Sequence, residues 1–355
     1  MDYAKLDRRT VLTGMAAFAF AGCSKAITAQ DNDTAVAQKK IRGWSISPSF
    51  PEAVQEIYPC AHKGRIHLAG GFTAQSGMIT GPTAAHHVWA PGTSAWERAL
   101  DLPVARHHPH LISFNDQLLA FAGFESTVDT PFAQGAWTIQ QTGWALSADG
   151  MNWLDMPEMP APAAEAVVGV TGDNVLHLAG GRTWQTAGTT GGWRDHIDTD
   201  HHFVLSDLDG PWEQAAPCLY KRNSAAGAVI DGHLHNVGGR QVGGGNVAYH
   251  TVYDHKEDRW HTLAPMPQAQ GGLAAAAIDG ELYAFGGEFF DNGGGVYPQG
   301  WVYDPARDGW ATLPVMPNPR HGLGAVALGA DIYVIGGALK ASGIETSALV
   351  ERFTP

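Results

Sequence analysis

The chain has 355 residues and a formal net charge of −13, with 44 Gly, 12 Trp and only three Cys. The excess of acidic side chains disfavours nucleic acid or an anionic membrane surface as a partner. The cysteines at positions 23, 60 and 218 form neither a disulfide framework nor a zinc site of paired cysteines. A single Cys60–Cys218 bridge would require an oxidising compartment.

Residues 1–29 have the pattern of an export signal rather than of a folded domain. Arg8 and Arg9 precede an apolar run over residues 11–22 that is too short to span a bilayer. An arginine pair in front of such a run resembles a twin-arginine signal. We therefore expect a periplasmic or exported protein with no membrane span.

Two features near residue 23 leave the processing of this signal open. The stretch "FAGC", which ends at Cys23, resembles a lipoprotein box and would give a membrane-tethered protein. The stretch "ITA" before Gln30 could instead serve an ordinary signal peptidase. Residues 30–40 are polar and read as a linker, so we expect the folded domain to cover residues 41–355.

Two series of residues mark a repeat along this domain. The first consists of short apolar segments that end in a glycine pair or nearly so, and the second consists of single tryptophans. The last glycines of the first series are Gly71, Gly123, Gly181, Gly239, Gly287 and Gly337. The tryptophans are Trp44, Trp96, Trp153, Trp212, Trp260 and Trp310. Both series advance by steps of 48 to 59 residues, and the steps of the two series lengthen and shorten together. The differences in step length therefore indicate insertions within whole repeats.

Each repeat reads as four short strands. In "HGLGAVALGADIYVIGG", residues 321–337, small and apolar residues alternate up to a Gly329 turn, and a second strand over residues 331–335 ends at the glycine pair. A third strand such as "GWVYDP" and a fourth that begins near Trp310 follow in the other repeats. We expect Trp310 to pack between neighbouring repeats.

The two ends of the domain complement each other. The last repeat has a third strand near residues 348–353 but no tryptophan after it, whereas residues 42–51 contain a lone Trp44 strand. Pairing these two segments would close the ring of repeats and remove a free sheet edge. The sequence therefore predicts that the N-terminal strand completes the last repeat.

The glycine pairs, the tryptophan series, "VYDP" at 302–305 and "MPNPR" at 316–320 resemble the kelch-repeat family over essentially the whole domain. The resemblance implies an all-β fold, a six-bladed kelch β-propeller whose last blade is closed by the N-terminal strand. It says little about function, since propellers include binding modules, enzymes and scaffolds.

The long loops of the repeats are expected on one face of the propeller, with the short hairpin turns on the other. The residue after each glycine pair belongs to this long-loop face, near the mouth of the central channel. In chain order these residues are Phe72, Phe124, Arg182, Arg240, Glu288 and Ala338. Loops between repeats add charged and histidine side chains, among them Glu56, Arg106, His107, His108, His110, Glu165, Arg222, Arg320 and His321.

Arginine can hold a carboxylate through two hydrogen bonds, and His and Glu can move protons near neutral pH. We therefore expect Arg182, Arg240, Arg222 and Arg106 to bind a ligand, and Glu288, His107, His108 and Glu165 to be catalytic. For Arg106 and Arg320 a role in bonding the backbone of neighbouring repeats remains equally open. Trp184, Trp193 and Tyr249 are candidates for contact with a sugar ring.

The segment 182–203 also carries His196, Asp198 and His201, which are weak candidates for metal ligands because their spacing matches no specific metal motif. No cofactor is expected otherwise, and a divalent metal stays open. The sequence contains no GxSxG, GxxxxGK[ST] or HExxH.

Three functions fit these residues. Export, six repeats and an Arg, His and Glu channel mouth resemble periplasmic kelch proteins that interconvert sugar anomers, such as sialic acid mutarotases. This implies a mutarotase or epimerase acting on an acidic sugar or saccharide at the long-loop face. The alternatives are a lyase that cleaves a polysaccharide or oligouronate, with a His or one of Tyr58, Tyr249 and Tyr297 as base, and a non-catalytic binder of glycans or proteins.

Overall fold

The computed structural model describes residues 43–126, 136–186, 191–193 and 195–355. The predicted export signal, Cys23 and the linker lie outside the described residues. Within the described part, no helix is long and apolar enough to cross a membrane. The two remaining cysteines, Cys60 and Cys218, are buried and free.

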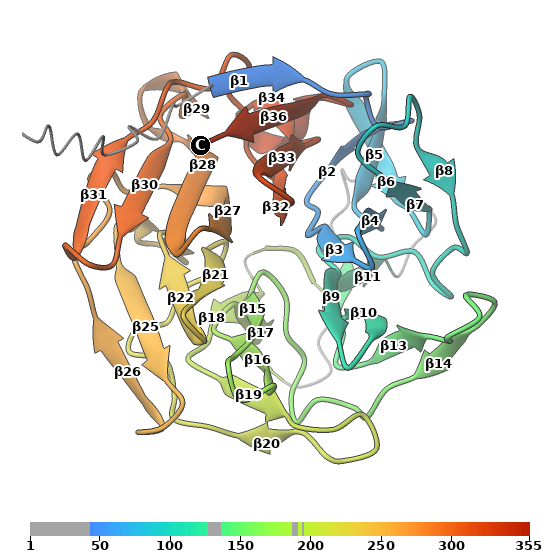
Figure 1. Ribbon diagram of the computed structural model, residues 1–355, viewed down its shortest axis with the longest axis vertical. Coiled ribbons are helices and arrows are strands. Elements are labelled where there is room, and N and C mark those ends of the chain that lie inside the picture. The colour runs from blue at the N-terminus through green and yellow to red at the C-terminus, as the bar shows by residue number, and fades with distance from the viewer. Residues whose placement is uncertain (1–42, 127–135, 187–190, 194) are drawn as a thin grey trace, which may run out of the picture. The chain divides into compact units, whose positions relative to one another are not determined.

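Six antiparallel sheets, each with a path of four strands, are arranged around a central axis within the described residues (Figure 1). We call these sheets blades 1 to 6. The strands, from the axis outwards, are β3 (Cys60–His62), β4 (Arg65–Ala69), β7 (His86–Trp89) and β8 (Glu97–Arg98) in blade 1; β9 (His110–Phe114), β10 (Gln117–Phe121), β13 (Gly143–Leu146) and β14 (Trp153–Asp155) in blade 2; β15 (Val167–Val170), β16 (Leu176–Ala179), β19 (His202–Leu205) and β20 (Glu213–Gln214) in blade 3; β21 (Ala226–Ile230), β22 (His233–Val237), β25 (His250–Asp254) and β26 (Arg259–Thr262) in blade 4; β27 (Gly271–Ile278), β28 (Glu281–Phe289), β30 (Trp301–Asp304) and β31 (Gly309–Thr312) in blade 5; and β32 (Gly324–Leu328), β33 (Asp331–Ile335), β36 (Val350–Thr354) and β1 (Gly43–Ile46) in blade 6. This is the six-bladed β-propeller that the sequence predicts.

The predicted closure of the last blade is confirmed. Strand β1 pairs antiparallel with β36, with Gly43 opposite Thr354 and Trp44 opposite Phe353. The first and last strands of the domain thus share one sheet, in which β36 lies between β33 and β1 instead of at a free edge.

The predicted long loops fold into a second tier of short strands at one end of the blades. They form hairpins or add to blade strands, as β5 (Phe72–Gln75) and β6 (Met78–Pro82) with β2 (Ala53–Gln55); β11 (Phe124–Ser126) with β12 (Trp137–Ile139); β17 (Arg182–Trp184) with β18 (His196–Asp198); β23 (Arg240–Gln241) with β24 (Gly245–Asn246); β29 (Gly295–Val296) with β28; and β34 (Ala338–Lys340) with β35 (Ile344–Thr346). The 3₁₀ turns η2 (Asp291–Gly293) and η3 (Ala341–Gly343) lie in the last two of these insertions. The residues after the glycine pairs are thereby held on strands rather than on irregular loops.

Each blade tryptophan donates its indole N–H to a backbone carbonyl of the preceding blade. Trp310 donates to Ala264 at 2.9 Å, and Trp44 donates to Pro314 at 3.0 Å, which carries the pattern across the closure. The other four bonds run from Trp96 to Pro48, Trp153 to Leu100, Trp212 to Pro157 and Trp260 to Ala216, at 3.0 to 3.3 Å. We call these contacts the tryptophan seam. The expected position of Trp310 between blades is confirmed.

The glycine pairs join the blades closer to the axis. The N–H of Gly287 donates to the carbonyl of Arg320 in the next blade at 3.0 Å, and a Cβ on Gly286 would lie 2.3 Å from that same oxygen. Equivalent bonds run from Gly71, Gly123, Gly181, Gly239 and Gly337 to the blade that follows each of them. A Cβ on the last glycine of each segment would lie 2.3 to 2.9 Å from a neighbouring atom, which explains why the segments end in glycine.

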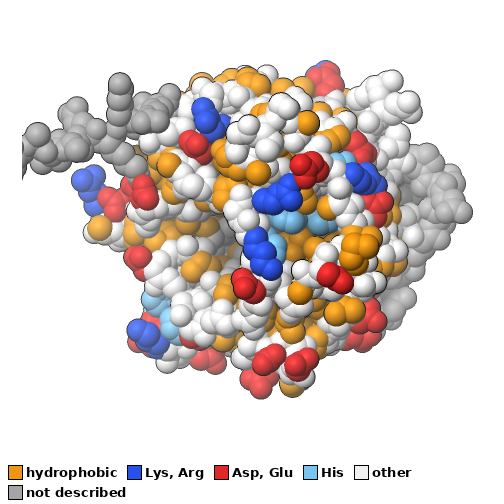
Figure 2. Space-filling view, turned by 45° about the vertical axis from the view of Figure 1, so that its right-hand side comes forward, with side chains coloured by type: hydrophobic (Ala, Val, Ile, Leu, Met, Phe, Trp, Pro, Cys, Tyr) orange, Lys and Arg blue, Asp and Glu red, His pale blue; other side chains and the backbone are white. Residues whose placement is uncertain are grey.

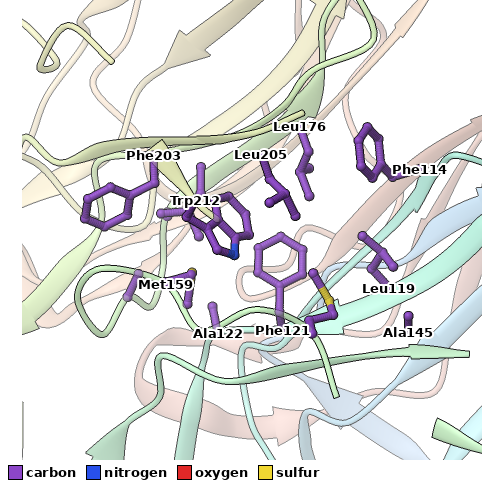
Figure 3. Close-up of a cluster of buried hydrophobic side chains, with 14 residues drawn as sticks. Phe114, Leu119, Phe121, Ala122, Ala145, Met159, Leu176, Phe203, Leu205 and Trp212 are labelled. Carbon is purple, nitrogen blue, oxygen red and sulfur yellow. The ribbon is translucent and has the colours of Figure 1, made fainter. Parts of the chain in front are cut away.

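The apolar core lies between neighbouring blades. One cluster joins Phe121 and Leu119 of blade 2 to Leu176, Leu205 and Trp212 of blade 3 (Figure 3). Buried apolar area of this kind supplies most of the stabilisation of such a contact. On the side of the molecule shown in Figure 2, acidic and basic side chains are interspersed with hydrophobic ones.

Candidate functional site

Six residues, one from each junction between blades, surround the central channel at one level. They share a left-handed backbone conformation with φ between 49° and 71°. They are Glu56, His108, Glu165, Ser224, Gly272 and Gly322, and we call them the girdle. Each stands twelve positions after a blade tryptophan. This spacing is visible in the sequence but was not part of the prediction of the site.

Backbone hydrogen bonds link the girdle residues around the channel. The N–H of Glu56 donates to Gly322, that of Gly322 to Gly272, and that of Gly272 to Ser224, at 2.7, 3.0 and 2.9 Å. Ser224 donates to Glu165 at 3.2 Å, and His108 donates to Glu56 at 3.0 Å. A left-handed conformation costs energy for residues other than glycine, and such strain concentrates at functional sites. Four of the six girdle residues are not glycine.

A cavity of about 570 Å³ lies above the girdle, on the side of the second tier of strands. Its floor includes Glu56, His108, Glu165 and Ser224, and its walls include aromatic rings from Phe72, Trp193 and Phe290. Below the girdle the channel widens into a second space of about 490 Å³, lined mainly by small and apolar side chains of the innermost strands. The girdle therefore separates a mouth lined by charged and aromatic side chains from a shaft lined by small apolar ones.

Arg182, Arg240 and Glu288, which follow glycine pairs in successive blades, all line this cavity, as expected. They also form ion pairs. Nε of Arg182 lies 3.0 Å from Oε1 of Glu165, and Nη2 of Arg240 lies 2.9 Å from Oε1 of Glu288. Both carboxylates are at least 95% buried, so their charges depend on these partners.

The two arginines differ in what they can still bind. Arg182 also donates from Nη1 to the Trp193 carbonyl at 3.2 Å and from Nη2 to Oδ1 of Asn223 at 3.1 Å, which engages both of its terminal nitrogens. Nε of each arginine has no hydrogen-bond partner among the described residues, but Arg240 uses only Nη2 of its terminal nitrogens, for Glu288. Burial acts to lower the pKa of Arg240, but Glu288 and Glu165 raise it overall, so this cation stays charged. Arg240 is the better candidate to hold an anionic group.

Glu56 is the most accessible carboxylate of the floor, with 23% of its side chain exposed. Its Oε2 lies 2.8 Å from Nε2 of His108, and its Oε1 lies 3.9 Å from Nδ1 of His321. Burial acts to raise the pKa of Glu56, but His108, His321 and Arg240 outweigh it and lower the pKa to about 2. Glu56 is therefore ionised at neutral pH. Glu56 was expected at the long-loop face but not among the catalytic residues.

His321 lies between two carboxylates. Its Nε2 donates to the Lys340 carbonyl at 3.0 Å, which directs Nδ1 towards Oε1 of Glu288 at 3.4 Å and towards Glu56. A second oxygen of Glu288 accepts the N–H of Ser342 at 2.9 Å. A histidine and two carboxylates around one edge of the cavity can exchange a proton with a bound hydroxyl group.

His107 and His108 are neighbours in sequence with different roles. His107 is fully buried between the rings of Phe72 and Phe124, with centroid distances of 4.0 and 4.7 Å. Burial, with His108 and His196, lowers the pKa of His107 far below its usual range, so the ring is neutral. His107 does not line the cavity, although we expected it among the catalytic residues.

The two imidazoles are joined by a hydrogen bond of 2.7 Å between their Nδ1 atoms. We assign the proton of this bond to His107, because Nε2 of His107 has no partner and an unpaired lone pair costs less than an unpaired N–H. Nε2–H of His108 then donates to Glu56. His107 thus fixes the tautomer and orientation of His108, which does line the cavity.

Arg106 and Arg222, which we expected to bind ligand, lie elsewhere. Arg222 is 2% exposed and donates to the carbonyls of Gly238 and Tyr249 at 2.9 and 2.8 Å. Arg106 is 1% exposed, donates to the Thr142 carbonyl at 2.8 Å and pairs with Glu125. These arginines bond the backbone of the following blade, which is the alternative that the sequence left open for Arg106.

Of the expected aromatic contacts, Trp193 lines the cavity whereas Trp184 and Tyr249 do not. Trp184 is buried against His196, and Tyr249 stacks on Tyr220 at 4.1 Å. Tyr58 and Tyr297, the other tyrosines considered as bases, are also absent from the described cavity lining. Burial and the nearby Glu165 and Glu56 raise the pKa of Tyr58 well above its usual value.

The weak metal candidates are not brought together. Asp198 accepts hydrogen bonds from Nδ2 of Asn223 at 2.5 Å and from the Val242 N–H at 2.6 Å. Burial lowers the pKa of His196 to about 4, and among the described residues neither of its ring nitrogens has a hydrogen-bond partner. The groups of three or more potential ligands in the described part of the chain include neither of these residues, nor His201.

Comparison with known proteins supports the fold and leaves the chemistry open. No protein family and no curated protein matches the sequence. Among solved structures, that of YjhT matches with a TM-score of 0.69 and 13% sequence identity, over 85% of this chain and 95% of that one. At this identity the likeness shows a shared β-propeller fold alone.

Proposed function

We propose that the cavity above the girdle binds a sugar or a short saccharide and interconverts its anomers, as a mutarotase does. The observation that carries this proposal is the convergence of Glu56, Glu288, His108, His321 and Arg240 on one cavity of about 570 Å³. That volume lies in the range of small-molecule sites. The aromatic rings of Phe72, Trp193 and Phe290 offer flat apolar walls for the C–H faces of a sugar ring.

Anomer exchange requires a base for the anomeric hydroxyl and an acid for the ring oxygen. Two such pairs face the cavity: Glu56 with His108, and Glu288 with His321. His321 stands between the two carboxylates and can pass a proton to either side of a ligand. The sequence resemblance to exported kelch proteins of this activity supports the same class, and an exported location is part of the proposal.

The acid group of an acidic sugar would be held by Arg240, because both terminal nitrogens of Arg182 already donate to Trp193 and Asn223. Arg240 lies near the aromatic ring of Phe290, with its guanidinium carbon 5.5 Å from the ring centre. This combination suits a carboxylate on a ring that rests against the aromatic wall.

A non-catalytic binder is the second candidate function. It is favoured by the ion pairs of the floor, which give a rigid polar surface without an exposed nucleophile. For the lyase, the tyrosines considered as its base do not line the described cavity, which leaves His108 or His321 for that role.

Nuclear magnetic resonance exchange spectroscopy on a panel of neutral and acidic monosaccharides tests the proposal. We expect the protein to accelerate anomer exchange of at least one acidic sugar, and Glu56→Gln to reduce that acceleration at least tenfold. Glu213→Gln, on the exposed strand β20, is the matched control and should leave it unchanged. Saturable binding without faster exchange would assign the protein to the binders. The absence of both binding and exchange would refute a sugar site here.

A further inference from the structure

A group of potential metal ligands lies in blade 4, at the end of the strands opposite the cavity. His233 is the first residue of β22, Asp254 is the last residue of β25, and His255 begins the turn to β26. Strand β22 runs from this end towards its glycine pair, so the group lies on the face of the short hairpin turns. None of its members belongs to the cavity described above.

We propose that His233, Asp254 and His255 bind a late first-row divalent metal ion, with Zn²⁺ as the ion to test. One ligand atom of each residue lies within 4.8 Å of the other two. Two imidazoles and one carboxylate form a donor set that suits Zn²⁺, Ni²⁺ and Cu²⁺ better than Mg²⁺ or Ca²⁺. All three side chains are partly exposed, so an ion can reach them from solvent.

The surrounding hydrogen bonds prepare two of the ligands. Nδ1 of His233 donates to the Tyr253 carbonyl at 3.3 Å, which leaves the lone pair on Nε2. Metal-binding histidines usually have such a partner on their second nitrogen. Oδ1 of Asp254 accepts the N–H groups of Lys256 and Glu257 at 2.8 and 3.4 Å, so the carboxylate is held in place while Oδ2 stays available.

One ring nitrogen of this group is unpaired. Nδ1 of His255 is buried and has no hydrogen-bond partner among the described residues. Such an atom costs free energy unless a ligand or water satisfies it. The rings of His233 and His255 lie 5.3 Å apart at 32°. Small side-chain movements would therefore bring both onto one ion.

A neighbouring group shares Asp254 and provides an internal comparison. Asp254, Glu257 and His261 also satisfy the distance criterion. Nε2 of His261, however, already lies 3.3 Å from Oε2 of Glu257, and both side chains are at least 40% exposed. We therefore assign the ion to His233, Asp254 and His255, where the ligands are less exposed and one is unpaired.

Bound metal would join the start of β22 to the turn after β25. An ion that binds only the folded state raises the stability of that state in proportion to the logarithm of its concentration. The site thus predicts a metal-dependent melting temperature that is independent of any sugar at the mouth.

Isothermal titration of Zn²⁺ into untagged protein tests this site, with visible spectroscopy of Co²⁺ as a second measurement. We expect one ion per chain with micromolar affinity or better and a rise in melting temperature. His233→Gln and His255→Gln should each weaken binding at least tenfold, whereas the control His261→Gln should leave it unchanged. Both site variants can be checked for folding by circular dichroism in the absence of metal.

Three results would overturn the assignment. They are the absence of saturable Zn²⁺ binding, a loss of binding in His261→Gln as large as in His233→Gln, and unchanged binding in both site variants. Tight binding of Mg²⁺ or Ca²⁺ with no preference for Zn²⁺ would contradict the proposed donor set. Because the sugar site is not involved, failure here leaves the proposed function untouched.

Discussion

The tryptophan seam and the girdle are two rings whose residues recur with the same spacing in the sequence. The side chain is constant in the seam and changes in the girdle. Every member of the seam is tryptophan, and each makes the same bond to the preceding blade. The girdle stands twelve residues further on and keeps one backbone conformation, yet its side chains are Glu, His, Glu, Ser, Gly and Gly. In a ring of repeats, a constant side chain indicates a shared packing role. A constant backbone with changing side chains indicates a site.

The arginines also fall into a group with a packing role and a group at the site. Arg106, Arg222 and Arg320 stand at one repeat position and bond carbonyls within the blades. Arg182 and Arg240 stand at another and face the cavity. The predictions below test this division, from the largest expected effect to the smallest.

Mild acid should weaken the seam before it affects the mouth. Buried His–His hydrogen bonds of 2.9 to 3.0 Å lie beside three of the seam tryptophans: His67–His86, His177–His202 and His235–His250. Burial is the main cause that lowers the pKa of these histidines to about 3 or 4. Unfolded histidine titrates near pH 6.5, so the unfolded chain binds protons that the folded chain excludes. Stability is complete above pH 6.5 and falls as the pH drops towards 4.

Both histidines of each pair have a lowered pKa, so each pair excludes at least one proton at pH 5. One proton per pair already corresponds to about 2 kcal/mol, or roughly 6 kcal/mol for three pairs. Urea unfolding between pH 7 and pH 5 measures this loss. The double variant His235→Gln and His250→Gln should remove about a third of the pH dependence. A free energy of unfolding that stays constant over this range would contradict the neutral His pairs.

Arg320→Ala should destabilise the protein by about 3–5 kcal/mol, because it leaves Glu351 charged and unpaired in the interior. Nη1 of Arg320 lies 2.6 Å from Oε2 of Glu351, and both side chains are fully buried. The control is Arg307→Ala, since Arg307 is 85% exposed beside Asp304 and should contribute less than about 1 kcal/mol. Equal losses in the free energy of unfolding for the two variants, measured in urea, would show that structural and surface arginines contribute alike.

At the mouth, loss of Arg240 should be separable into a stability effect and a binding effect. Arg240→Ala leaves Glu288 without its closest cation and should cost about 2 kcal/mol of stability. Adding Glu288→Gln should restore part of that loss. Affinity for an identified sugar should stay at least tenfold lower in both variants, or about 1.4 kcal/mol. If affinity recovers together with stability, the Arg240–Glu288 pair has a structural role only.

Ser224→Gly tests the strain of the girdle, and we expect a change in stability below about 1 kcal/mol. Glycine relieves the left-handed conformation at φ 49° but removes the hydroxyl that donates to Glu165. Asp231→Gly is a matched control, because Asp231 has the same φ of 49° in an exposed hairpin turn. The variant at residue 224 should be less stable than this control by about 1 kcal/mol. A larger gain from Ser224→Gly than from the control would mean that the hydrogen bond contributes nothing.

The sequence predicted the architecture because its signals are local and repeated. The glycine pairs, the tryptophans and the unmatched Trp44 strand were enough to predict six blades and their closure. The second tier of strands was expected as loops, because strands of two to five residues such as Arg240–Gln241 carry no periodicity to detect. Their pairing depends on the blades that support them.

The site was predicted only in part. Arg182, Arg240 and Glu288 were found because a glycine pair fixes the height at which each side chain leaves its strand. His107 and His108 could not be distinguished, since adjacent residues face opposite ways and only the fold decides which one meets the cavity. The role of Glu56 depends on His321, some 265 positions away in the chain, which no local pattern reveals.

The pairing of β1 with β36 also sets the order of events during folding. The strands of blades 1 to 5 are close neighbours along the chain, so these blades can form as the polypeptide lengthens. Blade 6 cannot, because Gly43 must wait for Thr354, more than 300 residues later in the chain. Until then β1 and β33 present unpaired edges. Strand β36 therefore decides whether a nascent chain becomes a ring or remains an open and aggregation-prone arc.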